Sequence, residues 1–150
     1  MRAIGYQTPL SIENPASLQD INLPKPVPTG RDLLVEIRAV SVNPVDTKVR
    51  SSAAPELGQW RVLGWDAAGI VVGTGPDATN FSVGDAVFHA GAINRPGTNA
   101  EFHLVDERIV GRKPLSLNWA AAAALPLTAI TAWEMLFDRL DIGRPVPGTT

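Results

Sequence analysis

The stretch Val62-Leu-Gly-Trp-Asp-Ala-Ala-Gly-Ile-Val-Val-Gly-Thr-Gly75 decides the fold of this 150-residue chain. Apolar residues dominate it, and Val and Ile crowd its second half, so the composition predicts one long buried strand. Small residues interrupt it at Gly64 and Gly69, where another backbone or a ligand can approach closely. Trp65 and Asp66 stand side by side within this apolar run, a placement that solubility does not explain.

Short strand-like segments lie on both sides of this stretch. Residues 33–42 alternate apolar and polar side chains, which predicts a strand. Asn43 and Pro44 then favour the start of a short helix over residues 45–50. Further strands are expected at residues 3–6, 18–23, 86–90, 100–105 and 109–113. Many short strands separated by turn signals predict a mainly β fold, a partly closed antiparallel barrel.

The character of the sequence changes near the C-terminus. Residues 116–125 are rich in Ala and predict a helix capped by Ser116 or Asn118 and ended by Pro126. Residues 127–140 place apolar side chains at helical spacing. Residues 145–150 are polar and rich in helix breakers. We therefore expect C-terminal helices after the barrel.

Composition excludes several classes of function. Thirteen Pro and thirteen Gly with 19% charged residues describe a turn-rich globular chain. The formal net charge of −2 gives no electrostatic case for binding nucleic acid or a membrane surface. There is no cysteine, and neither a signal peptide nor a membrane-spanning stretch is visible. A cytoplasmic protein is expected.

Four motifs in register carry a resemblance to a known family. They are Asn43-Pro-Val-Asp-Thr-Lys48, Leu63-Gly-Trp-Asp-Ala-Ala-Gly69, Gly84-Asp85-x-Val87, and Ala121-Ala-Ala-Ala-Leu-Pro126 with Thr131-Ala-Trp133. Together they resemble the N-terminal, GroES-like catalytic domain of the medium-chain dehydrogenase/reductases. The match is closest to the branch of zinc-type alcohol dehydrogenase-like proteins and quinone oxidoreductases.

The resemblance implies a fold and a domain arrangement. Residues 1–126 would form a GroES-like partly open β-barrel. Residues 127–150 would be a helix and linker leading into a nucleotide-binding domain that lies outside this chain. The chain is then expected to be a piece of a longer protein and, alone, to be inactive. The parent protein is expected to be a homodimer.

The resemblance also implies an activity. We expect the parent to be an oxidoreductase that uses NADPH or NADH to reduce quinones, enones or related conjugated carbonyls. Its partners would be a small-molecule carbonyl substrate and its own nucleotide-binding domain. Two alternatives stay open, a zinc-type alcohol dehydrogenase and a non-catalytic GroES-like binding module. A downstream Gly-x-Gly-x-x-Gly unit in the parent would exclude the second.

Asn43, Asp46 and Lys48 are the first candidate site residues. In quinone and enone reductases the matching positions line the nicotinamide and substrate cleft. Lys48 or Asn43 could then donate a hydrogen bond to a substrate carbonyl. The residues alone equally allow a purely structural role, in which Asn43 caps the helix, Asp46 faces its positive N-terminus and Lys48 is solvated.

Trp65, Asp66 and Thr131 complete the candidate set. Asp66 is either a buried partner for Lys48 or Arg50 or a structural carboxylate. Thr131 matches a family Thr that contacts the nicotinamide, and Asn43 is a second candidate cofactor contact. The alternative for Thr131 is a helix-interior side chain bonded to its own backbone.

No metal site is expected, and zinc is not expected as a cofactor. In zinc-dependent members of the family, the ligand positions fall here on Asn43, Trp65 and Leu127, none of which replaces the lost ligand. His89 and His103 are each expected to be alone on a strand, satisfied or partly exposed. The segment Gly73-Thr-Gly-Pro-Asp-Ala78 fits a dinucleotide fingerprint formally, but no helix follows it, so a tight turn is predicted.

Overall fold

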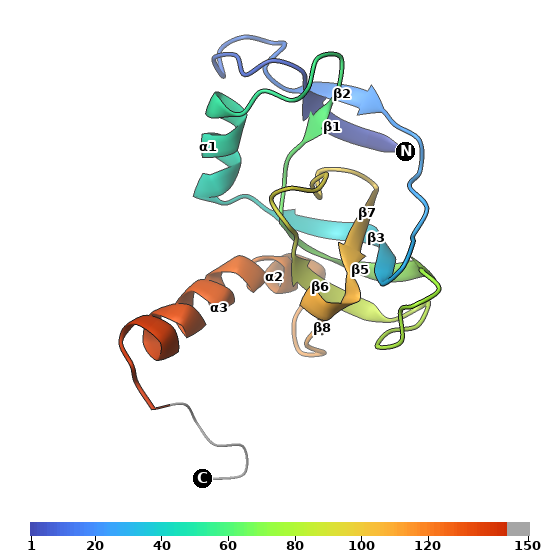
Figure 1. The fold of residues 1–150 in the computed structure, drawn as a ribbon, viewed down its shortest axis with the longest axis vertical. Coiled ribbons are helices and arrows are strands. Elements are labelled where there is room, and N and C mark those ends of the chain that lie inside the picture. Colours follow the sequence, from blue (N-terminus) through green and yellow to red (C-terminus); the bar gives the residue numbers. More distant parts are fainter. Residues whose placement is uncertain (144–150) are drawn as a thin grey trace.

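The computed structural model describes residues 1–143 as strands in two antiparallel sheets followed by C-terminal helices (Figure 1). The strands are β1 (Arg2–Tyr6), β2 (Gln19–Asn22), β3 (Asp32–Ser41), β4 (Arg61–Val62), β5 (Asp66–Thr74), β6 (Ala86–Ala90), β7 (Phe102–Asp106) and β8 (Val110–Arg112). The helices are α1 (Pro44–Ser52), α2 (Trp119–Ala123) and α3 (Pro126–Trp133), with a short 3-10 helix η1 (Glu107–Ile109) and a π-helical turn η2 (Glu134–Arg139). The predicted mainly β class with C-terminal helices is confirmed.

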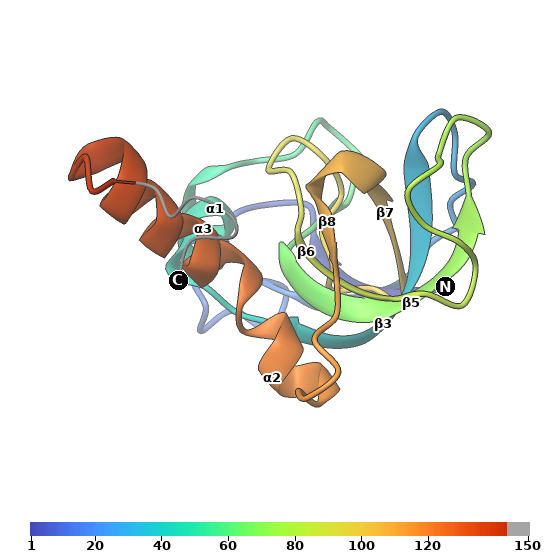
Figure 2. The ribbon, with the colours of Figure 1, turned by 90° about the horizontal axis from the view of Figure 1, so that it is seen from below.

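The strands form two separate open sheets rather than one closed barrel. One sheet has the order β2-β1-β4, and the other has the order β7-β3-β5-β6-β8. The larger sheet curves strongly around its own interior (Figure 2). Its core consists of five fully buried side chains, Leu33, Val35, Val71, Val87 and Val105. A single bridge between Ala3 and Ala100 brings the small sheet against the segment that precedes β7.

The predicted long strand over residues 62–75 is wrong in one respect, because it breaks into β4 and β5. Gly64 lies in the break with φ of +95°, a left-handed conformation that favours glycine. The carbonyls of the broken segment accept main-chain hydrogen bonds from Gly97, Thr98 and Asn99. These bonds replace regular strand pairing, so the chain can turn at Gly64 without leaving buried backbone groups unpaired.

The segment Gly73–Ala78 forms a turn, as predicted, rather than a phosphate-binding loop. β5 ends at Thr74, and no helix follows before β6 begins. The Asp77 amide donates to the Gly30 carbonyl at 2.9 Å, which ties this turn to the loop before β3. The backbone amides that a dinucleotide fingerprint presents to a ligand are therefore used within the fold.

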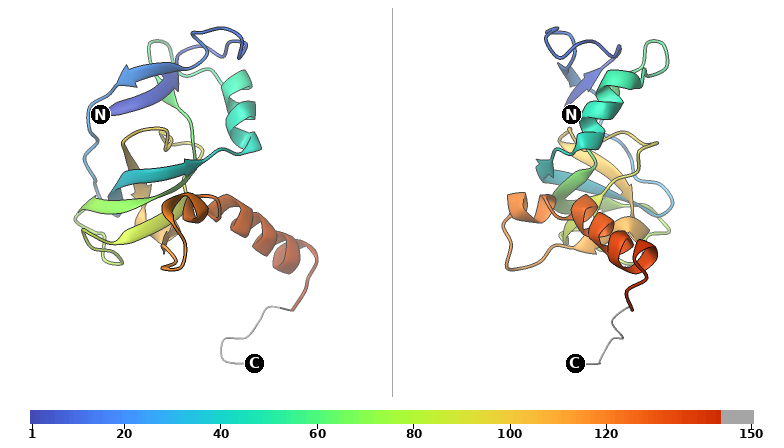
Figure 3. Two further views of the ribbon diagram at one scale, coloured as in Figure 1. Left: turned by 180° about the vertical axis from the view of Figure 1, so that it is seen from behind. Right: turned by 90° about the vertical axis from the view of Figure 1, so that its left-hand side faces the viewer.

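The C-terminal helices differ in how far they pack. α2 begins at Trp119 because the Asn118 side chain accepts the Ala121 amide at 2.8 Å, and its Ala face is buried against β5. In α3 only Pro126 is buried and Leu127 half-buried, whereas the residues that follow are exposed. α3 therefore projects from the barrel (Figures 2 and 3). Within residues 1–143, no helix has both the length and the apolar character needed to cross a membrane.

We predict that Gly69→Ala destabilises the domain by roughly 2–3 kcal/mol, because the new methyl group overpacks a rigid strand pair. A Cβ at Gly69 would lie 2.2 Å from the Glu36 carbonyl oxygen on the neighbouring strand β3. Gly73→Ala is the matched control on the same strand, since its Cβ would meet nothing closer than 3.5 Å. Urea unfolding of both variants gives the free energies, and equal stabilities would contradict the close approach seen here.

Candidate functional site

The start of α1 is built by Asn43 and Asp46. The Asn43 amide N–H donates to the Asp46 carboxylate at 2.8 Å, and the Asp46 amide donates to the Asn43 carbonyl at 2.9 Å. Asp46 is buried, and its second carboxylate oxygen, Oδ1, has no hydrogen-bond partner among the described residues. A carboxylate in the first turn also complements the positive end of the helix. Asp46 therefore has the structural role that the sequence allowed.

Asp66 lies at the centre of the site. It is fully buried at the start of β5, where it is paired with Ser41 of β3 and Ala90 of β6. Its carboxylate accepts one hydrogen bond from the Asn43 side-chain amide at 3.0 Å and another from the Leu127 backbone amide at 2.9 Å. Of the two alternatives left open for Asp66, the structural carboxylate is therefore the one observed, since its partners are Asn43 and Leu127 rather than Lys48 or Arg50.

The two cationic side chains that the sequence offered as alternative partners for Asp66 have other surroundings. Arg50 donates to the Leu10 carbonyl at 2.7 Å, so its charge serves the loop after β1. Lys48 is exposed on α1, and its ammonium has no side-chain partner within residues 1–143. Lys48 consequently remains available to a ligand, whereas the Asn43 amide is already bound to Asp66.

Burial sets the electrostatic character of Asp66. Loss of hydration raises the pKa of its carboxyl, and the nearby Asp46 charge raises it further. The hydrogen bonds from Asn43 and Leu127 act in the opposite direction and stabilise the ionised form. The pKa is raised on balance, so the two hydrogen bonds compensate the buried charge only in part.

Trp65 and Thr131 have mainly structural contacts in the described chain. Trp65 is 4% exposed and packs with Tyr6, Val49 and Leu63, while its indole N–H has no partner there. Thr131 is exposed on α3, and its hydroxyl donates to the Leu127 carbonyl at 2.9 Å. The backbone-bonded alternative for Thr131 is thus the one observed.

The prediction that each histidine is alone is wrong. His89 and His103 are 2% and 3% exposed, their rings stack at 5.1 Å, and His89 Nε2 lies 3.1 Å from His103 Nδ1. His103 Nε2 must donate to the Pro96 carbonyl, so His103 Nδ1 accepts the hydrogen bond from His89. Burial lowers the pKa of His89 to about 3 and that of His103 to about 4.

The residues at the family's zinc-ligand positions offer few atoms suited to binding the metal. The Asn43 amide nitrogen is a donor to Asp66, the Trp65 indole offers only an N–H, and the Leu127 side chain has no donor atom. A catalytic zinc needs three well-placed nitrogen, sulfur or oxygen ligands. Within residues 1–143, no three His, Cys, Asp or Glu side chains gather as a metal site would require.

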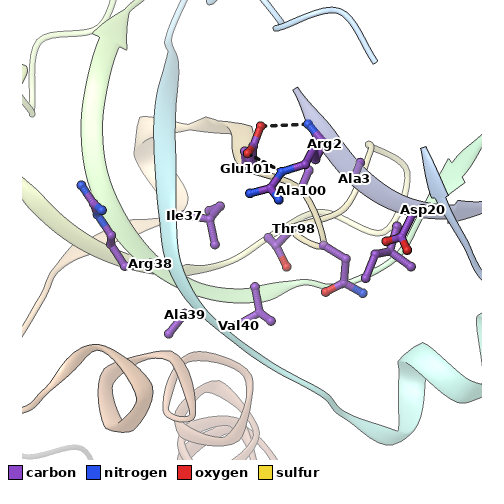
Figure 4. Close-up of a pocket in the computed structure, with 12 residues that line it drawn as sticks. Arg2, Ala3, Asp20, Ile37, Arg38, Ala39, Val40, Thr98, Ala100 and Glu101 are labelled. Carbon is purple, nitrogen blue, oxygen red and sulfur yellow. Dashed lines mark hydrogen bonds and ion pairs between the residues drawn. The ribbon is translucent and has the colours of Figure 1, made fainter. Parts of the chain in front are cut away.

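The larger cavities do not include the predicted site residues. The one of about 430 Å³ lies between β1, β3 and residues 98–101, where Arg2 and Glu101 form an ion pair at its rim (Figure 4). Asn43, Asp66 and Lys48 are absent from its lining. The candidate residues instead lie where α1 and α3 begin, on the same side of the molecule (Figure 1), with Asp66 buried and Lys48 exposed.

Comparison with known proteins places the chain in a family. Residues 29–115, more than half of the chain, match the family described as alcohol dehydrogenase GroES-like domain. A zinc-type alcohol dehydrogenase-like protein of Staphylococcus aureus is 44% identical over 142 residues, which cover 95% of this chain and 42% of the relative.

Solved structures agree with this assignment. A protein from Rhizobium etli described as a zinc-dependent alcohol dehydrogenase is 66% identical, with a TM-score of 0.92 over 99% of this chain and 43% of that one. The Escherichia coli quinone oxidoreductase in complex with NADPH is 26% identical, with a TM-score of 0.79 over 95% of this chain and 41% of that one. The chain thus spans less than half of the length of these relatives. It belongs to the alcohol dehydrogenase GroES-like domain family, as an N-terminal domain of the medium-chain dehydrogenase/reductases.

Proposed function

We propose that this chain is the catalytic domain of an NAD(P)H-dependent reductase of quinones, enones or related conjugated carbonyls, and that it works without zinc. One observation carries the proposal: Lys48 is exposed on α1 without a side-chain partner among residues 1–143, and the family's zinc-ligand positions hold Asn43, Trp65 and Leu127. The likeness to a quinone oxidoreductase that binds NADPH supports the choice of cofactor class.

The proposed chemistry needs a hydrogen-bond donor at the carbonyl oxygen. A bound nicotinamide cofactor would supply a hydride to the β-carbon of the conjugated carbonyl, so that negative charge would develop on the oxygen. Lys48 would stabilise that charge more in the transition state than in the ground state, which raises the rate. The exposed hydroxyl oxygen of Thr131 on α3 can still accept a hydrogen bond from the cofactor.

A substrate comparison in the whole protein tests the proposed function. With NADPH, reduction of a quinone or an enone should have a higher kcat/KM than oxidation of simple alcohols with NADP. Dialysis against a chelator should leave the reductase activity unchanged. Faster oxidation of alcohols, or loss of activity that added zinc restores, would sink the proposal.

This chain alone should bind NADPH no more tightly than the millimolar range. Tight binding of a dinucleotide depends on a glycine-rich turn and helix N-terminus that hold the pyrophosphate, and the only matching segment here is the turn Gly73–Ala78. Titration calorimetry on residues 1–150 measures the affinity, with the whole protein as the control. Micromolar affinity of this chain would overturn the assignment of cofactor binding to another domain.

Metal analysis should find no stoichiometric zinc in the whole protein after dialysis without chelator. We expect this result because the three residues at the zinc-ligand positions of this domain, Asn43, Trp65 and Leu127, offer the metal no thiolate or imidazole. The His89→Gln/His103→Gln variant is the informative control, because these are the only two histidines of the chain. One zinc per chain that disappears in this variant would place a metal at the histidine pair and refute the zinc-free reading.

A further inference from the structure

We propose that the Asp66 carboxylate is a positioning group that fixes where α1 and α3 begin relative to each other. It deepens the proposed function, because Lys48 lies on α1 and Thr131 lies on α3. One buried side chain would thereby set the spacing between the substrate donor and the cofactor-facing helix.

The hydrogen bonds of Asp66 join three separate segments. Asp66 itself is fixed by main-chain pairing between β3 and β6 at the start of β5. One carboxylate oxygen accepts from the side chain of Asn43, the residue that precedes α1, and the other accepts from Leu127 in the first turn of α3. Asn43 is distant from Leu127 in sequence, so the carboxylate is their shared link.

Because α3 packs weakly on the barrel, the hydrogen bond from Leu127 to Asp66 matters for the direction in which the helix points. Beyond Pro126 and Leu127, the side chains of α3 are exposed. In the π-helical turn η2 that follows, Phe137 is half-buried and packs on Trp133. Few contacts with the barrel therefore hold the helix, and these lie at its first turn. The Leu127 bond to Asp66 falls at that point, where a small change in angle is amplified along the helix.

The same three segments are those that a catalytic zinc would join in zinc-dependent relatives of the family. Asn43 and Leu127 are two of those positions, and the third, Trp65, is the neighbour of Asp66 in the chain. A metal ion cross-links its ligands by coordination bonds, whereas Asp66 makes the cross-link with two hydrogen bonds. The carboxylate thus links the segments that precede α1 and open α3 through its own two oxygens.

Amide hydrogen exchange at Leu127 tests the link directly. Asp66→Ala should raise the exchange rate of the Leu127 amide at least tenfold, because its acceptor is removed. Asp66→Asn keeps an acceptor oxygen and should stay within about threefold of the wild type. Thr128→Ala is the control for general loosening of this helix start, since the Thr128 hydroxyl donates only to the Ala124 and Leu125 carbonyls between α2 and α3 and does not touch Asp66. Unchanged Leu127 exchange in a folded Asp66→Ala variant would overturn the proposal.

Exchanging the side chains of positions 43 and 66 gives a second test, which remains decisive if Asp66→Ala does not fold. Asn43→Asp alone places a second carboxylate against Asp66 and should lower the Tm. Adding Asp66→Asn lets the new amide donate to position 43 and accept from Leu127, so most of the Tm should return. Additive losses in the double variant would show that the two side chains are not coupled and would refute the link.

A kinetic readout in the whole protein separates positioning from simple stability. Asp66→Asn should change kcat and the Leu127 amide shift far less than Asp66→Ala, at a temperature where both variants are folded. The exchange result does not depend on which substrate is reduced. Failure of the reductase assay would therefore reject the proposed function alone, and failure of the exchange test would reject only the role of Asp66.

Discussion

Lowering the pH from 7 to 5 should reduce the free energy of unfolding of this domain by about 4 kcal/mol. The folded state keeps His89 and His103 neutral, with pKa values of about 3 and about 4, because both rings are buried. In the unfolded chain both histidines take up protons below their ordinary pKa of about 6.5. The unfolded state then binds more protons, so stability is complete above that value and is lost as the pH falls.

Urea unfolding at several pH values measures this loss. Between about pH 6 and pH 5, the slope of the unfolding free energy against pH should approach the value for uptake of two protons on unfolding, because His89 and His103 are the only two histidines in the chain. The domain should be near its unfolding threshold at pH 5, since domains of this size are stable by about 5–15 kcal/mol.

Two variants identify the histidines as the cause. His89→Gln/His103→Gln should flatten the pH dependence in this window, and either single substitution should leave about half of the slope. Equal stability of the wild type at pH 7 and pH 5 would mean that the two rings remain solvated in solution.

Local sequence patterns predicted the strands because each pattern reports the two faces of a single segment. Residues 33–42 alternate side chains, and β3 (Asp32–Ser41) has nearly the predicted bounds, although Leu33, Leu34 and Val35 are all buried and burial alternates only in its second half. The sequence marked Gly64 as a point of close backbone approach but did not predict the strand break there, because the break depends on hydrogen bonds from Gly97, Thr98 and Asn99, which lie far along the chain. A break in a strand becomes visible from sequence only when its new hydrogen-bond partners are known.

The histidine pair was missed for a related reason. His89 lies on β6 and His103 on β7, and two other strands separate β6 from β7 in the sheet. Only the curvature of that sheet brings the two rings together across its interior (Figure 2). Periodicity assigns a side chain to a face of a strand, but it carries no information about curvature.

The resemblance named Asn43 and Asp66 as candidates, but it did not predict the hydrogen bond between them. Charge alone suggested Lys48 or Arg50 as a partner for Asp66, since a buried carboxylate usually needs a cation. The structure instead supplies an amide side chain and a backbone N–H, both neutral donors. Within residues 1–143, Lys48 therefore has no side-chain partner, which is compatible with its proposed role as a donor to the substrate.

Lys48→Ala should lower kcat for a quinone or an enone about a hundredfold in the whole protein, because one donor to a developing oxyanion is typically worth about 3 kcal/mol. Cofactor affinity should change little. Lys48→Gln, which retains a neutral donor, should lose less, and Asp46→Ala should also have a smaller effect, since Asp46 holds the helix start.

Thr47→Ala is the matched control for Lys48, because Thr47 is exposed on the same helix and its hydroxyl bonds only to the Pro44 carbonyl. Its turnover should stay near that of the wild type. Asn43→Ala is a poorer probe of substrate contact, since it also removes a hydrogen bond from the buried Asp66. Near-wild-type kcat in Lys48→Ala would mean that the carbonyl oxygen meets a donor from outside this domain, and the proposed site would then be wrong.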